Sequence, residues 1–187
     1  MSLLEIKKFG CPVLRRQAAP VTAFEEGLKT LVADMFETMY EAQGIGLAAP
    51  QVGELRRVIV LDLGVHDPAF RPVALINPEV VSVQGEIDAD EGCLSFPDLT
   101  ADVRRPSTAR VRGCDPDGAP LELELTDLGA RAVLHEIDHL NGVLFIDHVG
   151  SLKRQLMRGA LRKLRKEGEK QPQTQKHTEP KSVNNRP

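Results

Sequence analysis

The sequence predicts one globular domain in which helices and strands occupy separate stretches of the chain. A helical pattern of apolar residues fills residues 22–43, strand-like patterns follow over 58–126, and helical patterns return after that. The chain has 187 residues, of which 41% are hydrophobic and 27% charged, as is typical of a single globular domain. We expect one domain over 1–167 and a disordered polar tail over 168–187.

The first helix is expected to follow an irregular N-terminal segment that covers residues 1–21. Thr22 and Glu25 have the spacing of a capping box. Apolar residues then recur at steps of three and four, at Phe24, Leu28, Leu31, Val32, Met35, Phe36, Met39 and Tyr40. The helix is expected to end near Gln43-Gly44, where glycine can adopt the left-handed conformation of a helix C-terminus.

Short apolar and alternating segments in the middle of the chain predict β-strands. They are Val58–Leu61, Val73–Ile76, Glu79–Gly85, Thr108–Gly113 and Leu121–Leu125. Asn77-Pro78 is expected to end the second segment. The turn sequence Asp115-Pro116-Asp117-Gly118 lies between the last two segments and predicts a hairpin.

Two helices are expected in the C-terminal part of the chain. The first runs from about Asp127 to Asn141, with Thr126 or Asp127 as its cap. The second starts with Ser151 as its cap and runs to about Glu167. Residues 152–166 of that helix include seven lysines and arginines and no Asp or Glu, in a chain with a net charge of −3.

Composition excludes several classes of protein. The three cysteines, at 11, 93 and 114, have no short spacing, which excludes a disulfide scaffold and favours a reducing compartment. No segment is long and apolar enough to span a bilayer, and no signal-peptide pattern is visible. The negative net charge and the absence of Trp argue against a nucleic-acid-binding protein as a whole. We therefore expect a soluble cytoplasmic protein with no membrane or DNA partner.

The motif with the clearest chemistry is His135-Glu136-Ile137-Asp138-His139, on the first of the two C-terminal helices. Residues four apart lie on one helix face, so both imidazoles can reach one metal ion. Glu136 can then reach a metal-bound water and act as its base. The alternative is that two structural histidines happen to have this spacing.

A catalytic metal needs a third protein ligand, and the sequence leaves its identity open. The third histidine of metzincins would stand at 145, which is Phe145, and Glu167 and Glu169 are poorly placed for a downstream glutamate. The remaining soft ligands are Cys11, Cys93 and Cys114. Cys93 has the best surroundings, because the glycine before it lets backbone approach a ligand closely. Taken alone, each cysteine is more often a small core residue.

A third unusual stretch, Gly44–Gly53, is rich in glycine and alanine. It lacks the Gly-Lys-Ser/Thr sequence of a phosphate-binding loop and the glycine pattern of a dinucleotide site. A flexible linker is the alternative, but Ile45 and Leu47 between the glycines indicate an ordered segment.

The three stretches together, in this order, resemble the peptide deformylase family. The family motifs G-φ-G-φ-A-A-x-Q, E-G-C-L-S and H-E-x-D-H-L correspond to Gly44–Gln51, Glu91–Ser95 and His135–Leu140. The resemblance covers about residues 1–165. It implies an α+β fold, with antiparallel or mixed β-sheets packed around a central metal-binding helix and with an N-terminal and a C-terminal helix.

The resemblance also implies an activity and its residues. The enzyme would be a metal-dependent hydrolase that removes the formyl group from the N-terminal formyl-methionine of newly synthesised polypeptides and releases formate. Its metal ligands would be Cys93, His135 and His139. Glu136 would be the general base and then the acid, while Gln51 and the backbone N–H of Leu94 would polarise the formyl oxygen. The substrate would contact Ile45, Gly46, Glu91, Leu128 and His135.

The cofactor that the resemblance implies is one divalent metal, Fe²⁺, with Zn²⁺, Ni²⁺ and Co²⁺ as alternatives. Two departures from the family pattern concern substrate affinity. Leu134 stands where glutamine is common, and the arginine that often follows C-L-S-φ-P is absent. Asp98 and Thr100 stand near that place, and Arg104 and Arg105 come a little later.

The basic helix 152–166 has two interpretations. The resemblance implies that it binds ribosomal RNA near the tunnel exit, whereas a basic run is more commonly a solvated helix face. A stripe of Leu152, Leu156, Leu161 and Leu164 is expected to anchor it. Two other readings of the whole chain are a zinc protease and a metal-storing or inactive relative. The histidines expected to be surface residues are His66, His148 and His177.

Overall fold

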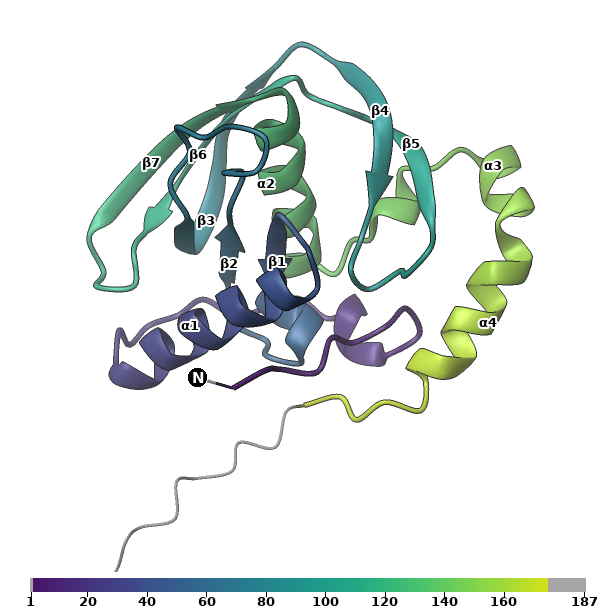
Figure 1. Cartoon of the computed structure of the whole chain (residues 1–187), viewed down its shortest axis with the longest axis horizontal. Helices are drawn as coiled ribbons and strands as arrows, with labels where there is room; N and C mark the ends of the chain where they lie inside the picture. The colour runs from purple at the N-terminus through teal and green to yellow at the C-terminus, as the bar shows by residue number, and fades with distance from the viewer. Residues whose placement is uncertain (1, 175–187) are drawn as a thin grey trace, which may run out of the picture.

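The computed structural model describes residues 2–174 and confirms the α+β fold (Figure 1). One antiparallel sheet has the strand order β1-β2-β3-β6-β7, and β4 and β5 form a separate antiparallel hairpin. The strands are β1 Gly46–Ala48, β2 Val58–Leu61, β3 Val73–Gln84, β4 Ile87–Gly92, β5 Thr100–Arg105, β6 Thr108–Cys114 and β7 Pro120–Thr126. The helices are α1 Glu26–Glu41, α2 Asp127–Leu140, α3 Ser151–Leu156 and α4 Arg158–Gly168.

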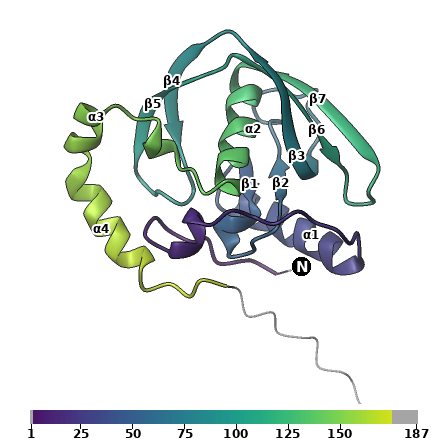
Figure 2. The same cartoon turned by 180° about the vertical axis from the view of Figure 1, so that it is seen from behind.

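Helix α2 lies in the centre of the molecule, between the five-stranded sheet and the β4–β5 hairpin (Figures 1 and 2). Its apolar residues recur at steps of three and four, at Ala130, Val133, Ile137 and Leu140, and all are buried. They pack with Ile59 and Leu61 of β2 and Val111 of β6. Because the sheet takes this face of the helix, Arg131 and His135 lie on the side of α2 that faces the hairpin, where both bond to Glu91 of β4.

Helix α1 covers the other face of the same sheet. Its Leu31 and Met35 belong to one buried cluster with Val58 and Val60 of β2. Alternate residues of a strand point to opposite faces, so β2 presents two residues to each helix. Burial on both faces explains why β2 is a continuous apolar run rather than an alternating one.

A third buried cluster joins the two ends of the chain to the hairpin. It contains Leu14 from the turn Pro12–Arg15, Val103 of β5, and Leu161 and Leu164 of α4. Phe96 lies within it, stacked on Phe9 and edge-on to Phe145, with ring centroids 4.9 Å apart in both pairs. The C-terminal helix therefore contributes to the core as well as to the surface.

The expected ends of α2 are confirmed, but the predicted side-chain caps of both helices are wrong. Helix α1 begins at Glu26, and the N-cap position is Glu25, which makes no side-chain capping bond. The chain before it is held by the side chain of Asn77, which bonds both to the N–H and to the carbonyl of Val21. At the other end Gln43, not Gly44, has the positive φ, of 56°. Thr126 occupies the N-cap position of α2 but also makes no side-chain capping bond.

Strands were predicted incompletely. Strand β3 is continuous where two segments were expected, because a register shift between Ile76 and Glu79 lets Asn77, with φ of 52°, pass through the sheet as a bulge. The hairpin β6–β7 is confirmed. Strands β1, β4 and β5 were not predicted. The polar residues of β4 and β5 hide the usual alternation, because the inward-facing positions include charged Glu91 and Arg105.

The C-terminal helix is divided into α3 and α4 at Met157, and Ser151 is the first helical residue rather than its cap. Leu161 and Leu164 are buried, as expected, but Leu152 and Leu156 are 74% and 81% exposed. The prediction that all four leucines form one anchoring stripe is therefore wrong for Leu152 and Leu156. These two lie on α3, which the break at Met157 separates from Leu161 and Leu164 on α4.

The first residues of the predicted tail lie against the N-terminal segment through the side chain of Gln171. Residues 175–187, which include His177, lie outside the described part of the chain. His66 is exposed, as expected. His148 is also exposed, but its Nε2 lies 2.8 Å from a carboxylate oxygen of Asp138.

Replacing Leu164 by alanine is expected to lower the free energy of unfolding by about 2–4 kcal/mol, because the side chain leaves a cavity in the third cluster. The matched change Leu156→Ala should cost less than about 0.5 kcal/mol, since Leu156 is exposed. Urea denaturation measures both. Equal losses would contradict the placement of α4 in the core.

Candidate metal centre

Cys93, His135 and His139 each place one possible ligand atom within 4.8 Å of the other two. The Cys93 Sγ lies 3.3 Å from His139 Nε2. Tetrahedral coordination by a thiolate and an imidazole puts these atoms about 3.5 Å apart, so the three side chains fit one divalent ion. The other two cysteines lie elsewhere, Cys11 in the third buried cluster and Cys114 at the end of β6.

The two histidines are brought together by α2, and Cys93 by the loop that follows β4. Two backbone hydrogen bonds fix this loop: Phe96 donates to the carbonyl of Cys93 over 2.8 Å, and Phe9 donates to that of Ser95 over 2.9 Å. The amide of Gln51 also donates to the Ser95 hydroxyl and lies 3.6 Å from the Cys93 Sγ.

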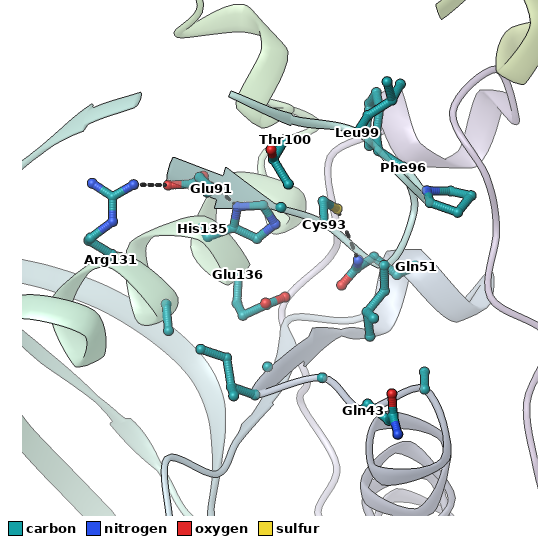
Figure 3. A pocket seen from close by; sticks show the side chains of 18 of the residues that line it. Gln43, Gln51, Glu91, Cys93, Phe96, Leu99, Thr100, Arg131, His135 and Glu136 are labelled. Carbon is teal, nitrogen blue, oxygen red and sulfur yellow. Dashed lines mark hydrogen bonds and ion pairs between the residues drawn. The ribbon is translucent and has the colours of Figure 1, made fainter. Parts of the chain in front are cut away.

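Glu91 holds His135 in orientation. One Glu91 carboxylate oxygen lies 2.7 Å from Nδ1 of His135, which leaves Nε2 as the nitrogen available to a metal. Arg105 donates two hydrogen bonds of 2.7 Å to the same carboxylate. Arg131 donates a third, of 3.1 Å, which Figure 3 shows as a dashed line. Burial raises the pKa of Glu91, but the bonds from Arg105 and His135 outweigh it and lower that pKa to about 2. The carboxylate is therefore ionised at neutral pH.

The pKa values of His135 and His139 are shifted in opposite directions. Burial lowers the pKa of His135, but the neighbouring Cys93 and Glu91 outweigh it and raise that pKa well above its ordinary value. Burial, the nearby His135 and Arg105 lower the pKa of His139 well below its ordinary value, so it is neutral. Neutral imidazole is the form that binds a metal, and a cation competes with the proton on His135.

Glu136 is buried beside these groups, and its Oε2 has no hydrogen-bond partner among residues 2–174. Burial raises the pKa of Glu136 to about 7. The approach of its carboxylate to β1 depends on a glycine, because a Cβ at Gly46 would lie 2.6 Å from Oε1. A buried carboxyl group of this kind can exchange protons near neutral pH.

A pocket of about 610 Å³ opens onto the metal-binding group (Figure 3). All the site residues expected from the sequence except His139 line it: Ile45, Gly46, Gln51, Glu91, Cys93, Leu94, Leu128, His135 and Glu136. Thr100 lines it in the region where many family members carry an arginine, whereas Leu134 packs in the core with the sheet. Of the two departures from the family pattern, only the one near Thr100 reaches the pocket.

Sequence reasoning missed Arg131 and the structural use of Arg105. Arg131 donates to the backbone carbonyls of Val103 and Ala89 as well as to Glu91, so it joins α2 to both strands of the hairpin. Arg131 stands four residues before His135 and so lies on the same face of α2. This spacing is the only sequence signal that could have placed Arg131 near the site.

A family model described as polypeptide deformylase matches residues 3–155. The chain belongs to the polypeptide deformylase family. The peptide deformylase of Thermodesulfovibrio yellowstonii is 47% identical over 158 residues, which cover 84% of this chain and 96% of that relative. That of Acidobacterium capsulatum is 46% identical over 169 residues, covering 90% and 99%.

Solved deformylase structures have the same fold. The peptide deformylase of Legionella pneumophila superposes with a TM-score of 0.82 at 41% identity, covering 91% of this chain and all of that one. That of Synechococcus elongatus, solved in complex with actinonin, has a TM-score of 0.77 at 40% identity, with 88% and 86% covered. In the described part of this deformylase, no helix combines the length and the hydropathy that crossing a membrane requires.

Cys93→Ala is expected to release the metal, because it removes the only sulfur of the group of three. Cys114→Ala should leave the metal content unchanged, since that thiol lies at the far end of the sheet. Elemental analysis after dialysis compares the two variants with wild type. Retention of metal by Cys93→Ala, or equal loss from both variants, would contradict the assignment.

Proposed function

We propose that this deformylase hydrolyses the formamide of N-terminal formyl-methionine on newly synthesised polypeptides in the cytoplasm, and that residues 1–167 form its catalytic domain. The observation that carries the proposal is the position of Glu136. A buried carboxyl oxygen that has no hydrogen-bond partner within residues 2–174 lies beside three convergent side chains able to bind a metal, and its residue lines a pocket. These are the parts that metal-assisted hydrolysis of an amide requires.

Cys93, His135 and His139 would hold the metal. When bound, a divalent ion would supply an acidic water near neutral pH and a positive charge that stabilises negative charge on the formyl oxygen. These side chains would provide one thiolate and two imidazoles, a ligand set that suits both Fe²⁺ and Zn²⁺. We propose Fe²⁺ as the resident metal, on the family resemblance, with Zn²⁺, Ni²⁺ and Co²⁺ as substitutes.

Glu136 transfers the proton. It accepts a proton from the attacking water and delivers it to the nitrogen of the leaving amine. A pKa of about 7 allows the same group to take the proton and give it back at neutral pH. Burial excludes bulk water from the carboxylate, so the proton goes to the leaving nitrogen.

Gln51 and the Leu94 N–H would stabilise the negative charge that develops on the formyl oxygen. The Gln51 Oε1 accepts a 2.8 Å hydrogen bond from the Ala48 N–H, which directs its amide nitrogen toward the Cys93–Ser95 loop. Both groups line the pocket on the side of Cys93. Removing one such donor costs roughly 3 kcal/mol of transition-state stabilisation.

The methionine side chain would pack against Ile45 and Leu128, two of the apolar residues that line the pocket. Gly46 would contact the substrate backbone. Glu91 also lines the pocket, but its carboxylate is bonded to His135, Arg105 and Arg131. We therefore assign Glu91 to holding the metal ligand rather than to binding the methionine directly.

A zinc protease is the second candidate, and the third ligand argues against it. A protease of the metzincin type needs a histidine at the position of Phe145, which instead packs against Phe96 and His135. Release of formate from formyl-Met-Ala-Ser by anaerobically purified protein, together with metal analysis, tests the function. Cleavage of an internal peptide bond without formate release would favour the protease.

Glu136→Gln is expected to keep the metal and to lose nearly all turnover, about 10³-fold or more. Glutamine has the same shape but cannot accept the proton. Formate release and metal content are measured on the same samples. Turnover near the wild-type level in the metal-loaded variant would exclude Glu136 as the base.

We also propose that the basic C-terminal helix binds ribosomal RNA. The support is the arrangement of its arginines. Arg154, Arg158, Arg162 and Arg165 recur at steps of three and four along one side of a groove of about 1070 Å³ between α3–α4 and the N-terminal turn. Guanidinium groups along a groove suit a phosphate backbone, and such binding weakens steeply with salt.

Substitution tests this better than truncation, since removing the chain after Gly150 would take Leu161 and Leu164 out of the core. Arg158→Ala/Arg162→Ala is expected to reduce pelleting with ribosomes at low salt about tenfold and to leave formyl-tripeptide hydrolysis unchanged. The matched control, Arg110→Ala/Arg112→Ala, removes the same charge from β6. Equal pelleting of both double variants would show that the helix is only a solvated face.

A further inference from the structure

The N-terminal segment 5–9 lies between the active-site loops and the C-terminal end of the described chain. In Figures 1 and 2 this segment runs past the base of the molecule, and the chain after α4 passes beneath it. It belongs to neither sheet and to no helix. Its position must therefore be set by individual contacts on its two sides.

On its inner side, the segment holds the two loops that carry the proposed oxyanion donors. The Lys7 N–H donates to the carbonyl of Gln51 over 2.7 Å, and the Phe9 N–H donates to that of Ser95 over 2.9 Å. Ser95 directly follows Leu94, whose N–H is the second proposed donor. Ile6 of the same segment lines the pocket. The segment thus joins the Gln51 turn to the Cys93–Ser95 loop.

On its outer side, the backbone of the segment bonds to the side chain of Gln171, and the Lys8 ammonium lies 3.7 Å from a carboxylate oxygen of Glu167. The Oε1 of Gln171 accepts a 2.6 Å hydrogen bond from the Lys8 N–H. Its Nε2 donates to the Ile6 carbonyl over 3.1 Å and to Glu5 over 2.9 Å. The hydrogen bonds of successive residues therefore alternate, with Lys7 and Phe9 bonded inward and Lys8 bonded outward.

The approach of the two chain ends is fixed by glycines. A Cβ on Gly168 would lie 2.3 Å from the carbonyl oxygen of Phe9, and a Cβ on Gly10 would lie 2.2 Å from that of Arg165. Backbones this close leave little freedom in where Gln171 meets the N-terminal segment. The position of Gln171 is therefore set by the end of α4, three residues earlier, which packs against the N-terminal segment.

We infer that Gln171 is a positioning residue for catalysis, which clamps the N-terminal segment so that Lys7 and Phe9 hold the Gln51 turn and the Cys93–Ser95 loop at the spacing that the oxyanion requires. This inference rests on the proposed function. In a chain whose bonds alternate in direction, fixing Lys8 outward also fixes its neighbours inward. Loss of the clamp should displace the two donors slightly, and donors placed for the transition state affect turnover more than substrate binding.

The test compares Gln171→Ala, Gln171→Glu and the control Gln173→Ala in the full-length, metal-loaded enzyme. For Gln171→Ala we expect kcat for formyl-Met-Ala-Ser to fall about fivefold to tenfold, with KM within about twofold and metal content unchanged. Gln171→Glu has the same size but replaces the donor with a second carboxylate next to Glu5, so it should be impaired at least as much. Gln173 is exposed, and Gln173→Ala should match wild type.

If the role of Gln171 were purely structural, Gln171→Ala would have a lower melting temperature but the wild-type kcat at the assay temperature. Gln171→Glu would then also have the wild-type kcat. Either result overturns the inference. Hydrogen exchange of the Lys7 and Phe9 amides gives a readout independent of the reaction, since both should exchange faster in Gln171→Ala. If wild type releases no formate, the proposed function fails. If wild type is active and Gln171→Ala shows unchanged kcat and unchanged exchange, only the clamp fails.

Discussion

The hydrogen bond between Glu91 and His135 is the interaction on which the metal centre depends. It is 2.7 Å long and buried, and it determines which nitrogen of His135 faces Cys93 and His139. A buried carboxylate is costly unless it is paired, and here Arg105 and Arg131 provide the pairing. The rest of the fold serves this arrangement. The sheet takes the apolar face of α2, and the β4–β5 hairpin brings Glu91 and Cys93 to its polar face.

The same burial explains how one site contains two carboxyl groups with different protonation, Glu91 on β4 and Glu136 on α2. Glu91 is ionised because cationic partners surround it, whereas burial raises the pKa of the neighbouring Glu136 to about 7, and no described residue bonds to its Oε2. Two carboxyl groups beside the same group of three side chains thus differ in protonation, which suits Glu91 to orienting His135 and Glu136 to the proposed proton transfer. Gly46 contributes by leaving the space that the Glu136 side chain occupies.

Much of this could be predicted from the sequence because the motifs are local. The i, i+4 spacing of His135 and His139 follows from helix geometry, and the boundaries expected from Thr126, Asp127 and Asn141 agree with the observed α2. What escaped prediction depends on contacts between distant segments. Strand β4 has charged residues facing inward, so its pattern resembles a loop until Arg105 and Arg131 are seen to pair with Glu91. The exposure of Leu152 and Leu156 follows from the helix break at Met157, where the sequence has no glycine or proline to indicate a break. Similarly, Asn77 disrupts a strand pattern but forms a bulge, because its side chain bonds to Val21.

The central claim is that one thiolate and two imidazoles bind the metal. X-ray absorption spectroscopy of the metal-loaded protein measures this directly, because sulfur and nitrogen ligands differ in distance, at about 2.3 Å and 2.0–2.1 Å for zinc. We expect one sulfur and two imidazole nitrogens bound to the metal in the wild-type protein, and no sulfur in Cys93→Ala loaded with the same ion. A spectrum of the wild-type protein with only nitrogen and oxygen ligands would contradict it.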